Sequence, residues 1–156
     1  MKLSKNQVVG IIISSVSIIT VAALGSLFVA LGMEWFNVLA KPNQWIANII
    51  IPIVWTIIYL SFAIVNFFWI KKSSIPKNIW ILMIANGALN VLWCLLFFTL
   101  NLTFIGLIAI ILNLIAGILL WIDIFKHEKI YSYILALYPI WLSIATTLNL
   151  ALWMLN

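Results

Sequence analysis

The sequence predicts an all-α integral membrane protein in which five transmembrane helices form one bundle. Hydrophobic residues make up 67% of the 156 residues and charged residues only 7%. Soluble domains contain about 45–50% apolar residues, so the surface of this fold is expected to face lipid. The apolar residues also fall into long, nearly uninterrupted runs. Because these runs use most of the chain, residues 1–156 are predicted to form a single domain.

The predicted spans cover residues 8–31, 46–70, 79–100, 102–125 and 130–155. Each exceeds the about 20 residues that a helix needs to cross a bilayer core of about 30 Å. Residues 79–125 are almost continuously apolar, but as one helix they would be roughly 70 Å long, more than twice that thickness. A reversal of the chain is therefore expected near Leu100 to Thr103.

The basic residues are all lysines, and the five spans place nearly all of them on one side of the membrane. That side takes Lys2, Lys5, Lys71, Lys72, Lys77, Lys126 and Lys129, whereas only Lys41 falls on the other. The positive-inside rule then predicts a cytoplasmic N-terminus and an outer C-terminus. It also explains the net charge of +5 without nucleic-acid binding. The composition, rich in Ile and Asn and without Arg, favours a bacterial plasma membrane.

The connection over residues 32–45 is the longest one predicted between the spans, and it lies on the outer side. Most of the nine tryptophans lie near the ends of the spans, where tryptophan prefers the interface. Trp55, Trp93 and Trp141 are instead expected in the hydrocarbon region.

Helical spacing gives these three tryptophans polar and aromatic companions. The second span carries Trp55, Tyr59 and Phe62, the third Asn86, Asn90, Trp93 and Phe97, and the fifth Tyr138, Trp141, Ala145 and Asn149. Asparagine is costly against lipid, so these faces are expected to turn inward. Two interpretations stay open at this point, namely helix packing joined by asparagine hydrogen bonds and a ligand cavity.

The fourth span carries small residues at helical spacing, namely Gly106, Ala109, Asn113, Ala116 and Gly117. Such a face suits either tight packing inside the bundle or a homodimer, and the first is favoured.

Conventional enzyme chemistry has few residues to use in this sequence. One cysteine and one histidine cannot build a metal site, and no cofactor is expected. No ionisable relay lies at mid-membrane depth, which weakens proton-coupled transport. Paired carboxylates and nucleophile-base pairs are absent too, so any reaction would depend on a bound ligand and an aromatic side chain.

An ordered set of residues resembles the TspO/MBR translocator proteins, also called tryptophan-rich sensory proteins. The set comprises Lys41-Pro42 with Trp45, Trp55, Leu89 to Trp93 with Phe97-Phe98, and Tyr138, Trp141, Ala145 and Leu148-Asn149. The resemblance implies a five-helix bundle, often dimeric, with a pocket for porphyrins and other tetrapyrroles. It also implies that the loop over residues 32–45 acts as a lid on this pocket. Animal members also bind cholesterol, so a lipid or sterol is an alternative partner. Tyr138-Pro139 stands where the family commonly has Pro-Tyr, which predicts a kink displaced by two positions.

The expected function is therefore a membrane protein that binds a porphyrin in the outer half of the bundle, with a sensing or regulatory role. Ligand-binding residues are expected to be Trp55, Tyr59, Asn90, Trp93, Tyr138, Trp141, Ala145, Asn149, Trp45 and Lys41. By resemblance, Trp55 and Trp141 would support light- and oxygen-dependent porphyrin breakdown, and Lys41 could meet a propionate. The alternatives are a transporter of small amphipathic solutes and a structural membrane subunit.

Overall fold

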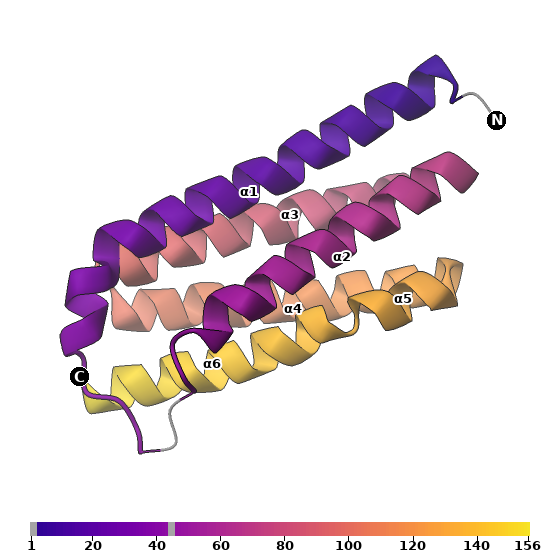
Figure 1. Cartoon of the computed structure of the whole chain (residues 1–156). Coiled ribbons are helices and arrows are strands. Elements are labelled where there is room, and N and C mark those ends of the chain that lie inside the picture. Colours follow the sequence, from indigo (N-terminus) through magenta and orange to yellow (C-terminus); the bar gives the residue numbers. More distant parts are fainter. Residues whose placement is uncertain (1–2, 44–45) are drawn as a thin grey trace.

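The computed structural model describes residues 3–43 and 46–156 and shows a bundle of long helices (Figure 1). Its elements are α1 (Lys5–Val38), α2 (Ile50–Lys72), α3 (Lys77–Cys94), the π-helix η1 (Leu95–Thr99), α4 (Thr103–His127), α5 (Lys129–Leu135) and α6 (Leu137–Leu155). Within the described residues, α1, α2, α3 with η1, α4, and α5 with α6 give five segments long and apolar enough to span a membrane. The predicted five-span membrane bundle is confirmed.

The helices close into a ring in the order α1, α2, α5 with α6, α4 and α3. Each contacts its neighbours in this order, whereas the described parts of α2 and α3 make no close backbone contact with one another. The ring leaves room at its centre, beside α2 and α3, for large side chains and for a cavity.

Helix α1 packs against both of its neighbours in the ring, α2 and α3 with η1. Near its N-terminus, a Cβ atom added to Gly10 would lie 3.4 Å from Ile70 of α2. Near its C-terminus, Gly32 lies so close to Phe98 of η1 that an added Cβ would collide with the Phe98 backbone carbonyl. Glycine is therefore required at residue 32 for the close approach of the two backbones.

The expected reversal between the third and fourth spans is present at Asn101, which has φ 57°. The amides of Leu100 and Leu102 on either side donate to the carbonyls of Leu95 and Leu96, both at 2.9 Å. Asparagine tolerates this left-handed conformation better than most residues, so it suits the turn.

Several helix boundaries differ from the sequence-based ones. The predicted span 8–31 continues as helix to Val38, so the first part of the predicted lid, residues 32–45, is helical. The span predicted from residue 46 begins at Ile50. Apolar length alone did not reveal that Glu34 and Asn37 would continue the helix beyond the apolar run.

The fifth span is interrupted at Ala136, between α5 and α6. Pro139 has no amide hydrogen to donate to the carbonyl of Leu135, four residues earlier, which explains a break at this place. The predicted kink in this span is thus present.

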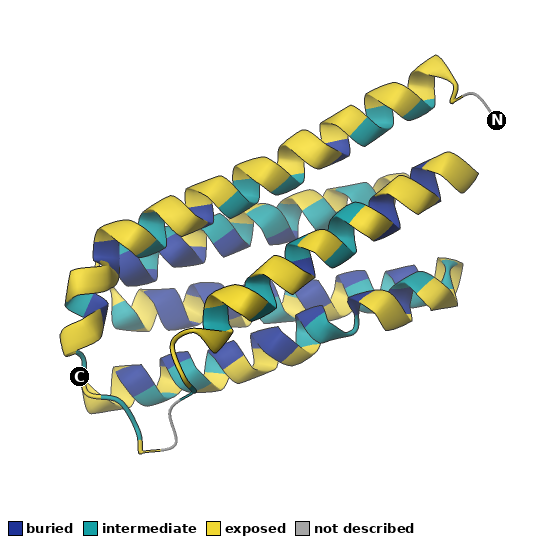
Figure 2. Cartoon of the chain, viewed as in Figure 1, coloured by how far each residue is buried: buried dark blue, intermediate teal, exposed yellow. Residues whose placement is uncertain are grey.

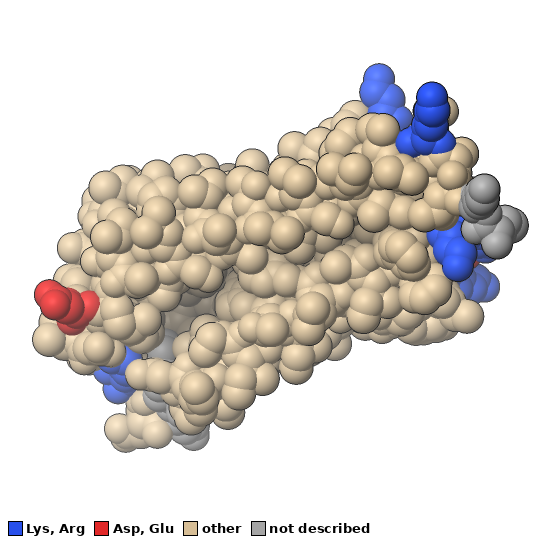
Figure 3. All heavy atoms as spheres, turned by 45° about the horizontal axis from the view of Figure 1, so that its top comes forward, with Lys and Arg blue, Asp and Glu red and all other residues tan. Residues whose placement is uncertain are grey.

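Many large aliphatic side chains are exposed on the outside of the bundle. Figure 2 shows that the exposed residues lie on the outward faces of the helices. Most lysines gather at the end of the bundle where α1 begins and α2 ends (Figure 3), namely Lys5, Lys71, Lys72, Lys77, Lys126 and Lys129. Lys41 and Glu34 lie at the opposite end. We call these the lysine-rich end and the lid end. Apolar side chains between two such ends are the pattern of a membrane-spanning protein.

Candidate functional site

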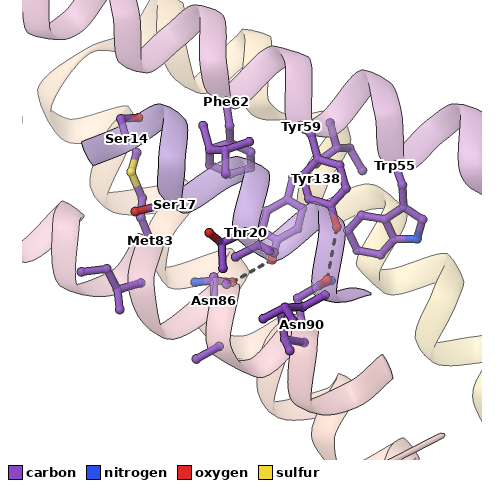
Figure 4. Close-up of a pocket in the computed structure, with 18 of the residues that line it drawn as sticks. Ser14, Ser17, Thr20, Trp55, Tyr59, Phe62, Met83, Asn86, Asn90 and Tyr138 are labelled. Carbon is purple, nitrogen blue, oxygen red and sulfur yellow. Dashed lines mark hydrogen bonds between the residues drawn. The ribbon is translucent and has the colours of Figure 1, made fainter. Parts of the chain in front are cut away.

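A cavity of about 670 Å³ lies between α1, α2 and α3 (Figure 4). It occupies the space where α2 and α3 do not pack on each other, and Tyr138 of α6 and Leu120 of α4 complete its wall. On α1 its lining extends from Ser14 to Phe28, which corresponds to roughly 20 Å along the helix axis. The cavity is therefore centred in the bundle and reaches further towards the lysine-rich end than the outer-half site expected from the sequence.

Aromatic rings form much of the wall near α2. The rings of Trp55 and Tyr59 stack with centroids 5.8 Å apart and an interplanar angle of 27°. Phe62 meets Tyr138 edge to face at 5.3 Å. The three residues of α2 recur on one face of the helix because they are spaced by about one helical turn, and that face turns towards the cavity.

The hydroxyls of two tyrosines join the helices around the cavity through asparagines. Tyr59 donates to Asn90 Oδ1 at 3.4 Å. Tyr138 lies within hydrogen-bonding distance of Asn86 Oδ1, at 3.1 Å, and Asn113 Oδ1, at 3.3 Å. These contacts satisfy polar groups that lipid could not satisfy.

Two side-chain amide atoms beside the cavity have no hydrogen-bond partner among the described residues. They are Asn90 Nδ2, a donor, and Asn66 Oδ1, an acceptor. Both asparagines line the cavity and each is only 3% exposed. Leaving such groups unpaired in an apolar surrounding costs free energy, so they favour a ligand with complementary polar atoms.

The described residues that line the cavity include no Lys, Arg, Asp, Glu or His. Lys41 is held elsewhere, because its Nζ donates to the carbonyls of Phe36, Asn37 and Leu39 at 2.9, 3.4 and 3.5 Å. The lysine thereby caps the C-terminal end of α1, where its positive charge interacts favourably with the helix dipole. The cavity itself is a largely neutral environment.

The structure brings only part of the predicted site together. Trp55, Tyr59, Asn90 and Tyr138 line the cavity. Trp93, Trp141, Ala145 and Asn149 are buried beside it, in contacts between helices. Trp45 lies outside the described residues. The aromatic and asparagine faces thus contribute to helix packing at some residues and to the wall of a cavity at others.

Trp141 differs from Trp55 in its surroundings. It is 4% exposed, belongs to the packed core and does not line the cavity. Its Nε1 has no hydrogen-bond partner among the described residues. Trp55, in contrast, is partly exposed and lies in the cavity wall, with its ring centroid 6.2 Å from that of Trp93.

Sequence reasoning missed the contribution of α1 to the cavity. Ser14, Ser17 and Thr20 line it from this helix, opposite Met83 and Gly87 of α3. Their spacing of three residues places the hydroxyls on one side of α1. That regular spacing was the signal that could have identified them.

The small-residue face of α4 packs inside the bundle. A Cβ atom added to Gly106 would meet Phe97, one added to Gly117 would meet Leu142, and Asn113 is fully buried. This confirms the interpretation of the face as internal packing.

The fold and the cavity together define a polytopic α-helical membrane protein with a ligand-sized, aromatic-walled cavity inside its helix ring. The model of the TspO/MBR family matches residues 14–154, and the chain belongs to this family. It is 31% identical to the tryptophan-rich protein TspO of Archaeoglobus fulgidus, over 96% of this chain and 99% of that protein.

Two bacterial proteins are similar as well. An uncharacterized membrane protein of Bacillus subtilis, YtaB, is 31% identical over 86% of this chain and 88% of its own length. The protein CrtK of Rhodobacter capsulatus is 24% identical over 78% of each chain. These relatives and the five spans make the chain an integral membrane protein of the same family.

Proposed function

We propose that this protein binds a porphyrin or a related tetrapyrrole in the cavity and serves a sensing or regulatory role in the membrane. The observation that carries the proposal is an aromatic-walled cavity of about 670 Å³ at the centre of the bundle. Small-molecule sites typically have about 300–1,000 Å³ and a mainly apolar lining with few polar groups. A flat, aromatic ligand fits this description.

In this proposal the macrocycle stacks on the Trp55 and Tyr59 rings, which offer two nearly parallel faces. Asn90 Nδ2 is available to a polar edge of the ligand. Because the described lining carries no cation, ionised side groups of a porphyrin would have to point out of the cavity.

A titration of the detergent-solubilised protein with protoporphyrin, followed by tryptophan fluorescence, tests the proposal. Saturable one-site quenching is expected, with about three- to tenfold weaker binding in Trp55→Phe through loss of stacking energy. Trp153→Phe is the matched control, because Trp153 is 41% exposed near the C-terminus and does not line the cavity.

Linear quenching shared by the wild type and both variants would indicate partitioning into the micelle and would contradict the proposal. It would favour a structural membrane subunit. Saturable flux of a solute into liposomes, without such quenching, would favour a transporter.

Breakdown of the bound porphyrin in light is a second, dependent proposal, which the place of Trp55 in the cavity wall supports. An excited porphyrin generates reactive oxygen, and an indole in contact with it can be oxidised. Decay of porphyrin absorbance under illumination should then slow in Trp55→Phe, with Trp141→Phe as the comparison. Equal decay in the wild type and both variants would end this proposal.

We also infer that the lysine-rich end is cytoplasmic, in a bacterial plasma membrane. The segregation of six described lysines to that end supports this orientation. Reporter fusions at the two termini test it, because a reporter active only outside the cytoplasm should be active at the C-terminus and inactive at the N-terminus.

A further inference from the structure

The cavity has a polar part nearest the lysine-rich end. Its lining there includes Ser14, Ser17 and Thr20 of α1 (Figure 4). Asn66 of α2 also belongs to this lining. Asn66 Nδ2 donates to Ser14 Oγ at 2.8 Å and so joins the two helices. We call these four residues the inner hydroxyl site.

The inner hydroxyl site has unused hydrogen-bonding capacity of both kinds. Asn66 Oδ1 is a buried acceptor with no partner among the described residues. Ser17 donates to the carbonyl of Ile13 at 2.8 Å, which leaves its oxygen free to accept. Thr20 makes no hydrogen bond to the described part of the chain, so its hydroxyl can donate and accept. Ser14 and Asn66 are buried, whereas Ser17 and Thr20 line the cavity where it is exposed. At lipid depth, such groups gain from a polar ligand atom.

The surroundings of the inner hydroxyl site are uncharged. The described lining carries no ionised side chain that could pair with a charged ligand. An unpaired carboxylate or ammonium would be strongly disfavoured on burial there. A hydroxyl group avoids this penalty and is the smallest group that both donates and accepts a hydrogen bond.

The cavity borders the lipid on the same side. Ile84 of α3 lines it and is 63% exposed, and Val16 of α1 lines it and is 57% exposed. The two helices approach closely at Gly87, where an added Cβ would lie 2.9 Å from Val21. Towards the lysine-rich end, Gly10 of α1 lies beside Ile70 of α2.

We propose that the inner hydroxyl site binds the hydroxyl group of an uncharged, single-chain amphiphile that enters from the lipid between α1 and α3. The ligand hydroxyl donates to Ser17 Oγ and accepts from Thr20 Oγ1. The apolar chain lies along Met83 and Phe62 of the cavity lining. This site stands apart from the stacking surface of Trp55 and does not depend on porphyrin binding.

Thermal unfolding of the protein in a detergent without hydroxyl groups, lauryldimethylamine oxide, tests the inference. Dodecanol, dodecane and dodecanoate are compared at equal mole fractions in the micelle. Dodecanol is expected to raise the midpoint in a saturable way and more than the other two compounds, because only binding to the folded state stabilises by mass action.

Substitutions at Thr20 test whether the stabilisation by dodecanol arises at the inner hydroxyl site. Thr20→Val keeps the side-chain shape and removes the hydroxyl, so the apparent affinity for dodecanol should fall about three- to tenfold, the value of one neutral hydrogen bond. Thr20→Ser should restore it. Thr147→Val is the control, because Thr147 of α6 is exposed like Thr20 but lies outside the cavity lining, and its hydroxyl is bonded to the Ile144 carbonyl.

Equal stabilisation by dodecanol and dodecane in the wild type would overturn the inference. A preference for dodecanol that persists in the double variant Thr20→Val, Ser17→Ala would overturn it as well. The result is separate from the porphyrin titration, since Trp55→Phe should leave the preference for dodecanol unchanged. A larger effect of dodecanoate would also contradict it, because that outcome requires a cation in the site.

Discussion

Trp93 Nε1 donates a hydrogen bond of 3.1 Å to Asn149 Oδ1 and joins α3 to α6. Both side chains are buried, and the described backbones of these two helices make no close contact otherwise. Asn149 in turn donates to the Ala145 carbonyl at 3.0 Å, so its amide is held in place from both sides. Indole and amide thus act here as a connection between helices.

This connection predicts a stability effect with little effect on ligand affinity. Trp93→Phe keeps an aromatic ring but removes the donor to Asn149, so the free energy of unfolding should fall by about 1 kcal/mol. A double-mutant cycle with Asn149→Leu, measured by unfolding in detergent, should give a coupling energy of about 0.6–1.7 kcal/mol. A coupling near zero, or a loss of porphyrin affinity as large as that of Trp55→Phe, would contradict this assignment.

The close approach of α1 and η1 predicts that Gly32 cannot be replaced. In Gly32→Ala the new methyl group would collide with the Phe98 carbonyl, and the helices would have to separate at a cost of about 2 kcal/mol or more. Gly10→Ala is the matched control, because its Cβ would lie at an ordinary distance of 3.4 Å from Ile70. Alanine also favours helix over glycine, so Gly10→Ala should be neutral or stabilising. Equal thermal midpoints for the two variants would refute the close contact.

The left-handed residue in the turn before α4 predicts a simple ranking of substitutions. Asn101→Gly should keep or slightly raise stability, since glycine adopts φ 57° without strain. Asn101→Val should lower it by about 1–2 kcal/mol, because a β-branched residue is strained there. Thermal unfolding of both variants checks the ranking, and the reverse order would show that residue 101 does not need this conformation.

The contacts of Lys41 predict that it matters more to the end of α1 than to the ligand. Lys41→Gln removes a cation that bonds to carbonyls of the last turn, so stability should fall by about 0.3–1 kcal/mol. Porphyrin affinity should change less than about twofold, because Lys41 does not line the cavity. A clear loss of affinity for the free acid, but not for its dimethyl ester, would instead support the propionate contact expected from the sequence.

Most of the fold followed from the sequence because lipid imposes simple rules on length and charge. The five spans and the reversal at Asn101 follow from the length of helix that a bilayer can hold. The interruption of the fifth span follows instead from the missing amide hydrogen of Pro139. The extent of α1 to Val38 did not follow, because a helix can continue past the apolar run and nothing in the composition marks where it stops.

The candidate site was only partly predictable for a different reason. Helical spacing shows which residues share a face, but it does not show what that face meets. The inward face of α2 meets the cavity, whereas that of α6 meets α3 and α4, so Trp55 and Trp141 have different surroundings despite similar sequence signals. The separation of α2 from α3, which leaves room for the cavity, depends on how all the helices pack in the ring. The residue pattern of a single helix does not predict it.

The inward orientation of the small residues of α4 determines what remains on its outer surface. That surface is built of large aliphatic residues, namely Ile108, Ile111, Leu112, Ile115, Ile118, Leu119 and Ile122. Acyl chains offer such a surface the same dispersion contacts as another protein would, so pairing of two copies through α4 gains little over solvation by lipid. A homodimer formed there would respond to dilution with lipid or detergent, and its population would report the crowding of the membrane as much as the affinity of the two chains.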